Sequence, residues 1–409
     1  MFTRLFPRFK SLSLIALGAL VAAGLGSKAC AQAPARSLGD VVISADLKNT
    51  PILVTGSTPE LNSLANQAFN AHGAFRRQPT NYTYKVAFTA AGPNQVQVTV
   101  TRAQGTQALN QVVSGASQRN ALFRAADLAV KAMTGKPGFF ASKLAFIGER
   151  TGKPEVYVGD LFLGEVKQIT NDKTLAMTPR WSPDGGRLIY TSYFRSGYPD
   201  IFTMDLGSLQ RSTFVSFKGT NSGARFSPNG QNVAMVLSGE GNPEIYVGNA
   251  SGRQITRKTR TSAVEASPSF SPDGSQLIFT SDAAGGPQLY VMPAAGGTAR
   301  RLPTRLSGYC AEPDWSRADP SKVAFTARIG RGYQIAVYDM KGGIAKQVSK
   351  QPADAVEPSW LADGRHVVFT SRSAGASSLW ILDTENGKAT QLSSASAGKC
   401  SQASVLDPR

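Results

Sequence analysis

A repeated pattern of apolar and polar segments dominates the second half of the chain. Each repeat holds an apolar run such as Leu277–Ser281, a third segment such as Gln288–Val291 and a short fourth one such as Arg300–Leu302. Four strand-like segments every 40 to 45 residues are typical of the blades of a β-propeller. Five aromatic-led turns open these repeats at intervals of 44 or 45 residues: WSPDG at Trp181, FSPNG at Phe226, FSPDG at Phe270, WSRAD at Trp315 and WLADG at Trp360.

The turns have residue types that suit a tight hairpin. Proline presets φ, aspartate bonds the following backbone, and glycine takes the positive φ that closes the turn. The aromatic residue before the turn supplies a large apolar group for packing between blades. Asp184, Asp273 and Asp363 are therefore interpreted as turn residues rather than cation ligands.

A sixth blade is indicated by segments that lack a leading turn. Lys143–Phe146, Glu155–Val158 and Val166–Thr170 repeat the second, third and fourth segments of a blade. The missing first segment lies at the other end of the chain, where Val405 follows Trp360 by 45 residues. The sequence thus predicts a mainly β protein, with a six-bladed β-propeller over residues 139–409 that the C-terminal strand closes, leaving no free sheet edge.

Residues 34–138 do not share the repeat. Their apolar positions alternate in some segments and follow helical spacing in others, and Gly135 and Pro137 end the last helix, so a small N-terminal α/β domain is predicted. The expected elements are strands at Val41–Ile43 and Ile52–Val54, a helix at Pro59–Ala71, a hairpin of Tyr82–Thr89 and Gln95–Thr101, and a helix at Asn120–Met133.

The first residues resemble an export signal. Arg4, Arg8 and Lys10 precede the apolar run Ser11–Leu25, which is too short for a membrane span, and small residues follow. Residues 1–31 are predicted to be a signal peptide cleaved after Ala31; lipidation at Cys30 and a retained anchor are the alternatives. The mature chain is expected to lie outside the cytoplasm and to have no transmembrane segment.

The chain is basic, with a formal net charge of +17. Removing Arg4, Arg8, Lys10 and Lys28 with the signal leaves +13. The basic residues are scattered along the sequence, with only short clusters such as Arg300–Arg301. A solvated basic surface, suited to anionic cell-envelope material, is favoured over nucleic-acid binding.

The sequence offers little for catalysis or for a cofactor. It has no G-x-S-x-G motif, and its two histidines, His72 and His366, fall in distant segments, where surface positions are expected. Neither a catalytic residue, a cofactor site nor a metal site is predicted. Cys310 and Cys400 occupy equivalent places two blades apart, too far for a bridge that needs Cα atoms within about 7 Å.

The order of these parts resembles a known family, TolB, the periplasmic component of the Tol-Pal cell-envelope system. The resemblance is based on the signal, the small α/β domain, six blades with WSPDG-type turns and the final strand. The junction from Ala125–Asp127 to Met133–Phe146 is particularly similar to the passage from the last helix to the first blade.

The resemblance implies a non-catalytic protein-binding scaffold. Its expected partners are a peptidoglycan-associated lipoprotein, Pal, at one mouth of the propeller, and a TolA-like inner-membrane protein at the mature N-terminus, residues 32–47. Glu265, Glu312 and Glu357 would form an acidic rim at this mouth. The partner-binding residues are predicted in the segments entering the innermost strands: Thr178, Pro179, Asn221, Ser222, Gly223, Ala266, Ser267, Ala311, Glu312, Val356, Glu357 and Gln402.

The predicted role is support of outer-membrane integrity and cell division. The alternative is an exported β-propeller that binds or hydrolyses a small ligand or glycan in its central channel. Recovery of a lipoprotein from envelope extract distinguishes the first hypothesis from the second, which predicts turnover of a peptide or glycan.

Overall fold

The computed structural model of the protein describes residues 49–408. The predicted signal peptide, the expected strand at Val41–Ile43 and the expected TolA-binding segment lie outside the described residues. Neither α-helix in the described part of the chain has the length and apolar character that crossing a membrane requires.

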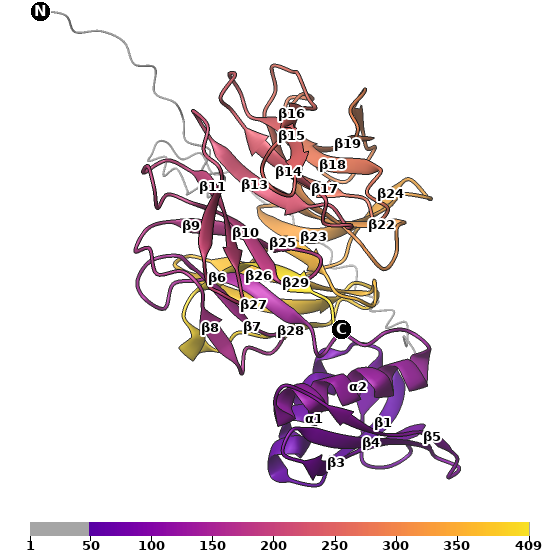
Figure 1. The fold of residues 1–409 in the computed structure, drawn as a ribbon. Helices are drawn as coiled ribbons and strands as arrows, with labels where there is room; N and C mark the ends of the chain where they lie inside the picture. The colour runs from indigo at the N-terminus through magenta and orange to yellow at the C-terminus, as the bar shows by residue number, and fades with distance from the viewer. Residues whose placement is uncertain (1–48, 409) are drawn as a thin grey trace, which may run out of the picture. The chain divides into compact units, whose positions relative to one another are not determined.

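The α/β region forms a five-stranded sheet with two helices packed on it (Figure 1). β1 pairs in parallel with β2 and β3, and β3, β4 and β5 form an antiparallel meander. The helix at Pro59–Ala71 and the hairpin are confirmed, whereas β2 and β5 were not anticipated. The elements are β1 (Thr50–Gly56), α1 (Pro59–Ala71), β2 (Phe75–Arg77), β3 (Tyr84–Gly92), β4 (Gln95–Arg102), β5 (Gln107–Ser114) and α2 (Gln118–Thr134).

Local sequence explains where the two helices begin and end. The hydroxyls of Thr58 and Ser117 accept hydrogen bonds from the backbone N–H groups of Leu61 and Asn120, 3.2 Å away in both cases, and so cap the first turns. Gly135 ends α2 with a φ of 74°, a conformation that glycine adopts without steric cost.

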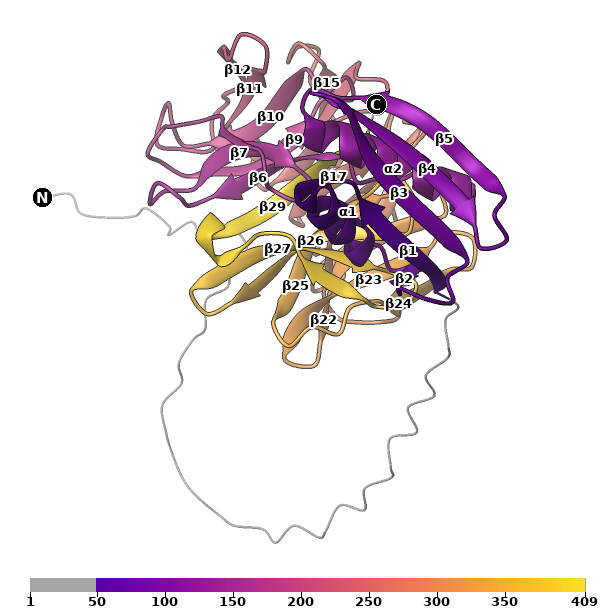
Figure 2. The same ribbon diagram turned by 90° about the horizontal axis from the view of Figure 1, so that it is seen from below.

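Six antiparallel four-stranded sheets form the propeller (Figures 1 and 2). This confirms the predicted fold class. The first three blades, each given from its innermost strand outward, are β29 (Cys400–Leu406), β6 (Lys143–Gly148), β7 (Glu155–Asp160) and β8 (Val166–Gln168); β9 (Ala176–Trp181), β10 (Arg187–Ser192), β11 (Asp200–Asp205) and β12 (Arg211–Val215); and β13 (Asn221–Phe226), β14 (Asn232–Leu237), β15 (Glu244–Asn249) and β16 (Thr256–Arg257).

The other three blades follow the same order. A short 3₁₀ helix, Ala395–Ala397, precedes the last strand of the chain. The strands are β17 (Glu265–Phe270), β18 (Gln276–Ser281), β19 (Gln288–Pro293) and β20 (Arg300–Arg301); β21 (Cys310–Trp315), β22 (Lys322–Ile329), β23 (Gly332–Asp339) and β24 (Ile344–Gln347); and β25 (Asp354–Trp360), β26 (His366–Ser373), β27 (Ala376–Asp383) and β28 (Ala389–Gln391).

The last strand of the chain closes the ring. β29 pairs with β6 antiparallel, and Val405 lies opposite Leu144, as the sequence predicts. Both residues are buried. The first blade therefore consists of segments from both ends of the described chain.

The aromatic residues before the turns connect neighbouring blades. The indole N–H of Trp181 donates to the carbonyl of Ser404, and that of Trp360 donates to the carbonyl of Asp314, each on the preceding blade. Asp273 accepts bonds from Ser271 and Ser275 within its own turn, which confirms its turn role.

The α/β region and the propeller share one hydrophobic core. Phe69 of α1 and Phe123 of α2 belong to the same buried cluster as Val368 and Leu379 of the sixth blade. The carboxylate of Asp127 accepts hydrogen bonds from two backbone N–H groups of the linker, and burial raises its pKa to about 7. The predicted domain limits, 34–138 and 139–409, stay a prediction.

Candidate functional site

Each innermost strand of the propeller has a β-bulge at the same position. The pairing register shifts there in all six blades. One residue per bulge takes a positive φ, which costs energy for any residue except glycine. These residues, with φ between 50° and 63°, are Thr178, Gly223, Ser267, Glu312, Glu357 and Gln402.

Hydrogen bonds connect the bulges of consecutive blades. The backbone N–H of Glu357 donates to Oε2 of Glu312 at 3.0 Å, and the N–H of Gln402 donates to Oε2 of Glu357 at 3.1 Å. Oε1 of Gln402 then accepts from the N–H of Thr178 at 2.7 Å. Four blades are thus connected in sequence, because each of these side chains satisfies a backbone donor that the next bulge releases.

The two glutamates in this series, Glu312 and Glu357, are half-buried, and their negative charges repel each other. Thr326 donates to Oε2 of Glu312 at 2.7 Å, and Thr370 donates to Oε2 of Glu357 at 2.8 Å. Burial, and next the charge of Glu357, raise the pKa of Glu312 to about 7. One oxygen of each carboxylate therefore stabilises the fold. The channel wall also contains an acid, Glu312, whose charge changes near neutral pH.

The bulges surround a narrow cavity in the channel. Its volume is about 80 Å³. Six of the predicted binding residues line it: Gly223 and five residues that have side chains. Burial lowers the pKa of Arg180 to about 10, which leaves its guanidinium charged at neutral pH. The lining consists of Thr178, Arg180, Gly223, Arg225, Ser267, Pro268, Glu312, Pro313, Glu357, Pro358 and Gln402.

Arg180 and Arg225 were not anticipated as channel residues. Each directly precedes the aromatic residue of its turn, Trp181 or Phe226, and the guanidinium of Arg225 forms an ion pair with Asp314 on another blade. The sequence carries this signal: the residue before each of the five turn aromatics is polar, as is the residue before Val405 in the sixth repeat, and we expected no role for it.

All of the predicted binding residues lie within the innermost strands, not in the loops before them. Thr178, Gly223, Ser267, Glu312, Glu357 and Gln402 meet at the cavity. Ser222 and Ala266 are half-buried next to it. The other four are buried, so their side chains support the wall instead of facing a partner: Pro179, Asn221, Ala311 and Val356.

The side chain of Asn221 holds two loops together at the mouth of the propeller. Its side-chain amide donates to the carbonyls of Pro199 and Phe217, and its Oδ1 accepts from the N–H of Phe217. The side chain is fully buried. It thereby connects the loop between β10 and β11 with the loop between β12 and β13.

The expected acidic rim is wrong. Glu265 is only 1% exposed, and it lies beside Glu244, which is also buried. Burial and a hydrogen bond with Glu244 raise the pKa of Glu265 to about 8, so the two carboxylates share a proton at neutral pH. Glu312 and Glu357 are engaged between blades, so none of the three glutamates is a solvated rim residue.

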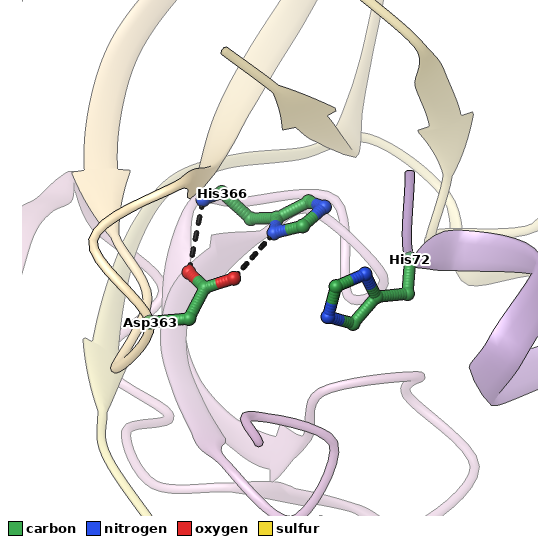
Figure 3. A group of neighbouring side chains, drawn as sticks. All are labelled: His72, Asp363 and His366. Atoms are coloured by element: carbon green, nitrogen blue, oxygen red, sulfur yellow. Dashed lines mark hydrogen bonds and ion pairs between the residues drawn. The ribbon is translucent and has the colours of Figure 1, made fainter. Parts of the chain in front are cut away.

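The expectation that both histidines lie on the surface is also wrong. His72, at the end of α1, is 3% exposed, and His366, at the start of β26, is fully buried. The two rings lie 4.5 Å apart between centroids (Figure 3). Distant segments meet here because α1 packs against the sixth blade. Nδ1 of His366 lies 2.6 Å from Oδ2 of Asp363, and Asp383 lies 3.5 Å from Nε2.

Charge balance decides the protonation state of this group. Burial alone would lower the pKa of His366, but the carboxylate of Asp363 and that of Asp383 outweigh it and raise the pKa to about 9. The N–H of Gly73 lies 3.1 Å from Nε2 and would favour a neutral ring. We assign the imidazolium, because with Arg365 it balances the two buried carboxylates.

His72, Asp363 and His366 are a group of three whose ligand atoms lie within 4.8 Å of one another. An imidazolium has no lone pair for a metal ion. Nδ1 of His72 already accepts a hydrogen bond from Ala74, and burial lowers the pKa of His72. The arrangement therefore fits an ion pair within the sixth blade, against which the ring of His72 packs, better than it fits a metal centre.

Cys310 and Cys400 are both buried and free, as their blade positions predict. Burial raises the pKa of the thiols of Cys310 and Cys400. The thiolate is the reactive form, so these groups are inert packing residues.

These features define a class: a six-bladed β-propeller with a bulged, hydrogen-bonded channel and an N-terminal α/β region. Residues 130–328 match the family model described as the TolB beta propeller domain. The crystal structure of TolB from Acinetobacter baumannii is similar, with a TM-score of 0.77 and 25% identity, over 88% of this chain and 97% of that one. The chain is thus similar to TolB in sequence and in fold.

Two curated TolB proteins are also similar in sequence to part of this chain. The Tol-Pal system protein TolB of Desulfosudis oleivorans is 35% identical over 144 residues, which is 35% of this chain and 32% of that protein. The protein TolB homolog of Chlorobium chlorochromatii is 33% identical over 136 residues, 33% of this chain and 30% of that protein. The matched segments span about a third of the length of these relatives.

Proposed function

We propose that the protein is a non-catalytic periplasmic scaffold of the Tol-Pal system that binds a peptidoglycan-associated lipoprotein at the mouth of its propeller and supports outer-membrane integrity and cell division. The observation that carries this proposal is the channel wall. Its bulges are fixed between blades by Glu312, Glu357 and Gln402, which gives a preorganised concave surface of the kind that binding sites use. The similarity to TolB supports the choice of partner.

The hydrogen bonds of the two glutamates also favour binding over hydrolysis. An acid that works in catalysis needs to reach a substrate, whereas Glu312 and Glu357 each commit an oxygen to a neighbouring threonine and to a backbone N–H. The wall they form is a fixed surface. Engagement of a TolA-like protein by residues 32–47 is part of the same proposal.

The test is affinity capture from envelope extract, followed by identification of bound proteins by mass spectrometry. Recovery of a lipoprotein with an OmpA-like domain is the expected result. Turnover of a peptide or glycan library by the purified protein, with no such lipoprotein captured, would overturn the proposal in favour of the ligand-binding or hydrolytic alternative.

A matched pair of variants connects binding to the channel. Glu312→Gln and Glu357→Gln keep the oxygen that accepts the inter-blade hydrogen bonds and remove only the charge. We expect this double variant to capture the lipoprotein at least as well as the unchanged protein, because the wall keeps its inter-blade hydrogen bonds and loses only negative charge. The control is Glu240→Gln, which removes an acid that is 63% exposed in the loop between β14 and β15.

A further inference from the structure

Every loop that connects one blade to the next carries an exposed basic residue. These loops lead from the outermost strand of a blade to the innermost strand of the next, so they all lie at the end of the propeller where the bulged strands begin. Asp172 is the only acid in these six loops, and it is buried in an ion pair with Arg211. The six residues, here called the basic collar, are Lys173, Lys218, Arg260, Arg305, Lys350 and Lys399.

The basic collar is largely uncompensated. Lys399 lies 3.3 Å from Glu149, and both side chains are more than a third exposed, so water screens this pair. Six cations around one concave opening give a focused positive potential, because their fields add over the mouth. The fold therefore gathers six of the basic residues that are scattered along the sequence at one end of the propeller.

An aromatic patch lies at the same end. Phe194 and Tyr198, in the loop between β10 and β11, are 53% and 69% exposed, and Phe217, in the loop between β12 and β13, is 54% exposed. Asn221 connects these two loops. The guanidinium of Arg211 lies 4.2 Å from the ring centroid of Phe194. Exposed Tyr and Phe side chains beside Arg are the composition of protein-binding surfaces.

We propose that the basic collar and the aromatic patch form one docking surface for a protein whose contacting face is acidic. This inference depends on the proposed function, because it describes the face that the lipoprotein partner presents to the mouth. Charge complementarity selects the acidic face, and the aromatic patch selects a protein over a bare polyanion. The collar accelerates encounter, and the aromatic residues hold the docked complex.

The experiment measures association and dissociation rates of the soluble domain of the organism's own peptidoglycan-associated lipoprotein, at low and at physiological salt. The collar variant is Lys218→Gln, Arg260→Gln and Lys350→Gln, three exposed positions with φ below zero. Its matched control is Lys167→Gln, Arg253→Gln and Lys341→Gln, equally exposed residues on outer strands or on the turns at the opposite end.

We expect the collar variant to associate about tenfold more slowly at low salt, with a smaller salt dependence, and the control to match the unchanged protein. Tyr198→Ala with Phe217→Ala is expected to raise the dissociation rate instead. If the unchanged protein does not bind the lipoprotein domain, the proposed function and this inference both fail. If it binds with rates that neither salt nor the collar variant alters, only the docking inference fails. Loss of heparin binding in the collar variant, with lipoprotein rates unchanged, would likewise overturn it, since the collar would then serve a polyanion.

Discussion

Nδ1 of His366 lies 2.6 Å from the carboxylate of Asp363 inside the contact between the α/β region and the sixth blade. The group belongs to three segments, because Asp363 lies in a blade turn, His366 begins the next strand and His72 ends α1. Removing one partner of a buried ion pair strongly destabilises the folded protein, since the other partner is left charged and buried.

His366→Ala is expected to lower the free energy of unfolding by about 3–5 kcal/mol, because Asp363 loses its partner and a cavity is left. Chemical denaturation at pH 7 measures the change. His72→Phe is the control: His72 stacks on Phe139, 5.1 Å away, and an aromatic ring of similar size keeps that contact. A loss as large in the control as in His366→Ala would show that ring packing, not the ion pair, carries the contact.

The same ion pair predicts a dependence on pH. The pKa of His366 is about 9, above its ordinary value of 6.5, so its stabilising effect is complete below pH 6.5 and is lost as the pH rises through 9. The stability difference between the unchanged protein and His366→Ala should therefore shrink between pH 7 and pH 10. A difference that stays constant over this range would mean that His366 is neutral in the folded protein.

Glu265 and Glu244 predict a second effect of pH, at the junction of the third and fourth blades. The folded protein holds the proton of Glu265 up to about pH 8, whereas the unfolded chain releases it near the ordinary pKa of 4.5. Raising the pH from 5 to 8 therefore favours the unfolded chain.

Glu265→Gln removes this proton requirement and keeps a group that donates to Glu244. We expect it to raise the free energy of unfolding by about 2 kcal/mol at pH 8.5 and by less than about 0.5 kcal/mol at pH 5. Denaturation curves at the two pH values, with Glu240→Gln as the exposed control, give the comparison. An equal effect of Glu265→Gln at both pH values would rule out the shared proton.

Much of the fold could be predicted because the propeller repeats its own local chemistry. The turn at Trp360, the register of Val405 and the helix at Pro59–Ala71 each follow from spacing and residue type. The bulges could not be predicted in this way, since Glu357 and Gln402 adopt a positive φ, which residues with a side chain rarely do.

The candidate site was predicted less well than the fold. The segments that form the channel wall were found, but the burial of Glu265 depends on its place at the start of a strand, where Asn221, Cys310 and Cys400 are buried too. The meeting of His72 with His366 depends on how α1 packs against the sixth blade, which no local pattern specifies. The basic collar could be found from the sequence only by aligning the six loops according to their place in the blade, because they lie far apart along the chain.

The electrostatic coupling of Glu312 and Glu357 gives a further prediction. Glu357→Gln should lower the pKa of Glu312 from about 7, and the pKa should remain above its ordinary value of 4.5, because burial is the larger cause of the shift. Carboxyl ¹³C signals of labelled glutamate, followed through a pH titration, report this value. A pKa of Glu312 that does not move would show that the two carboxylates do not interact across the blades.

Gln402 connects the closing strand to the second blade, because its Oε1 accepts the hydrogen bond of the Thr178 N–H at 2.7 Å. Gln402→Ala leaves that donor without this acceptor in a half-buried position, so we expect a loss of about 1–2 kcal/mol in the free energy of unfolding. The amide of Thr178 should also exchange its hydrogen faster. Ser401→Ala, one residue earlier in β29, is the control for changing the strand itself. If Gln402→Ala is as stable as Ser401→Ala and the Thr178 amide remains protected, the hydrogen bonds between bulges contribute nothing to closing the ring, and strand pairing at Val405 and Leu144 alone holds it shut.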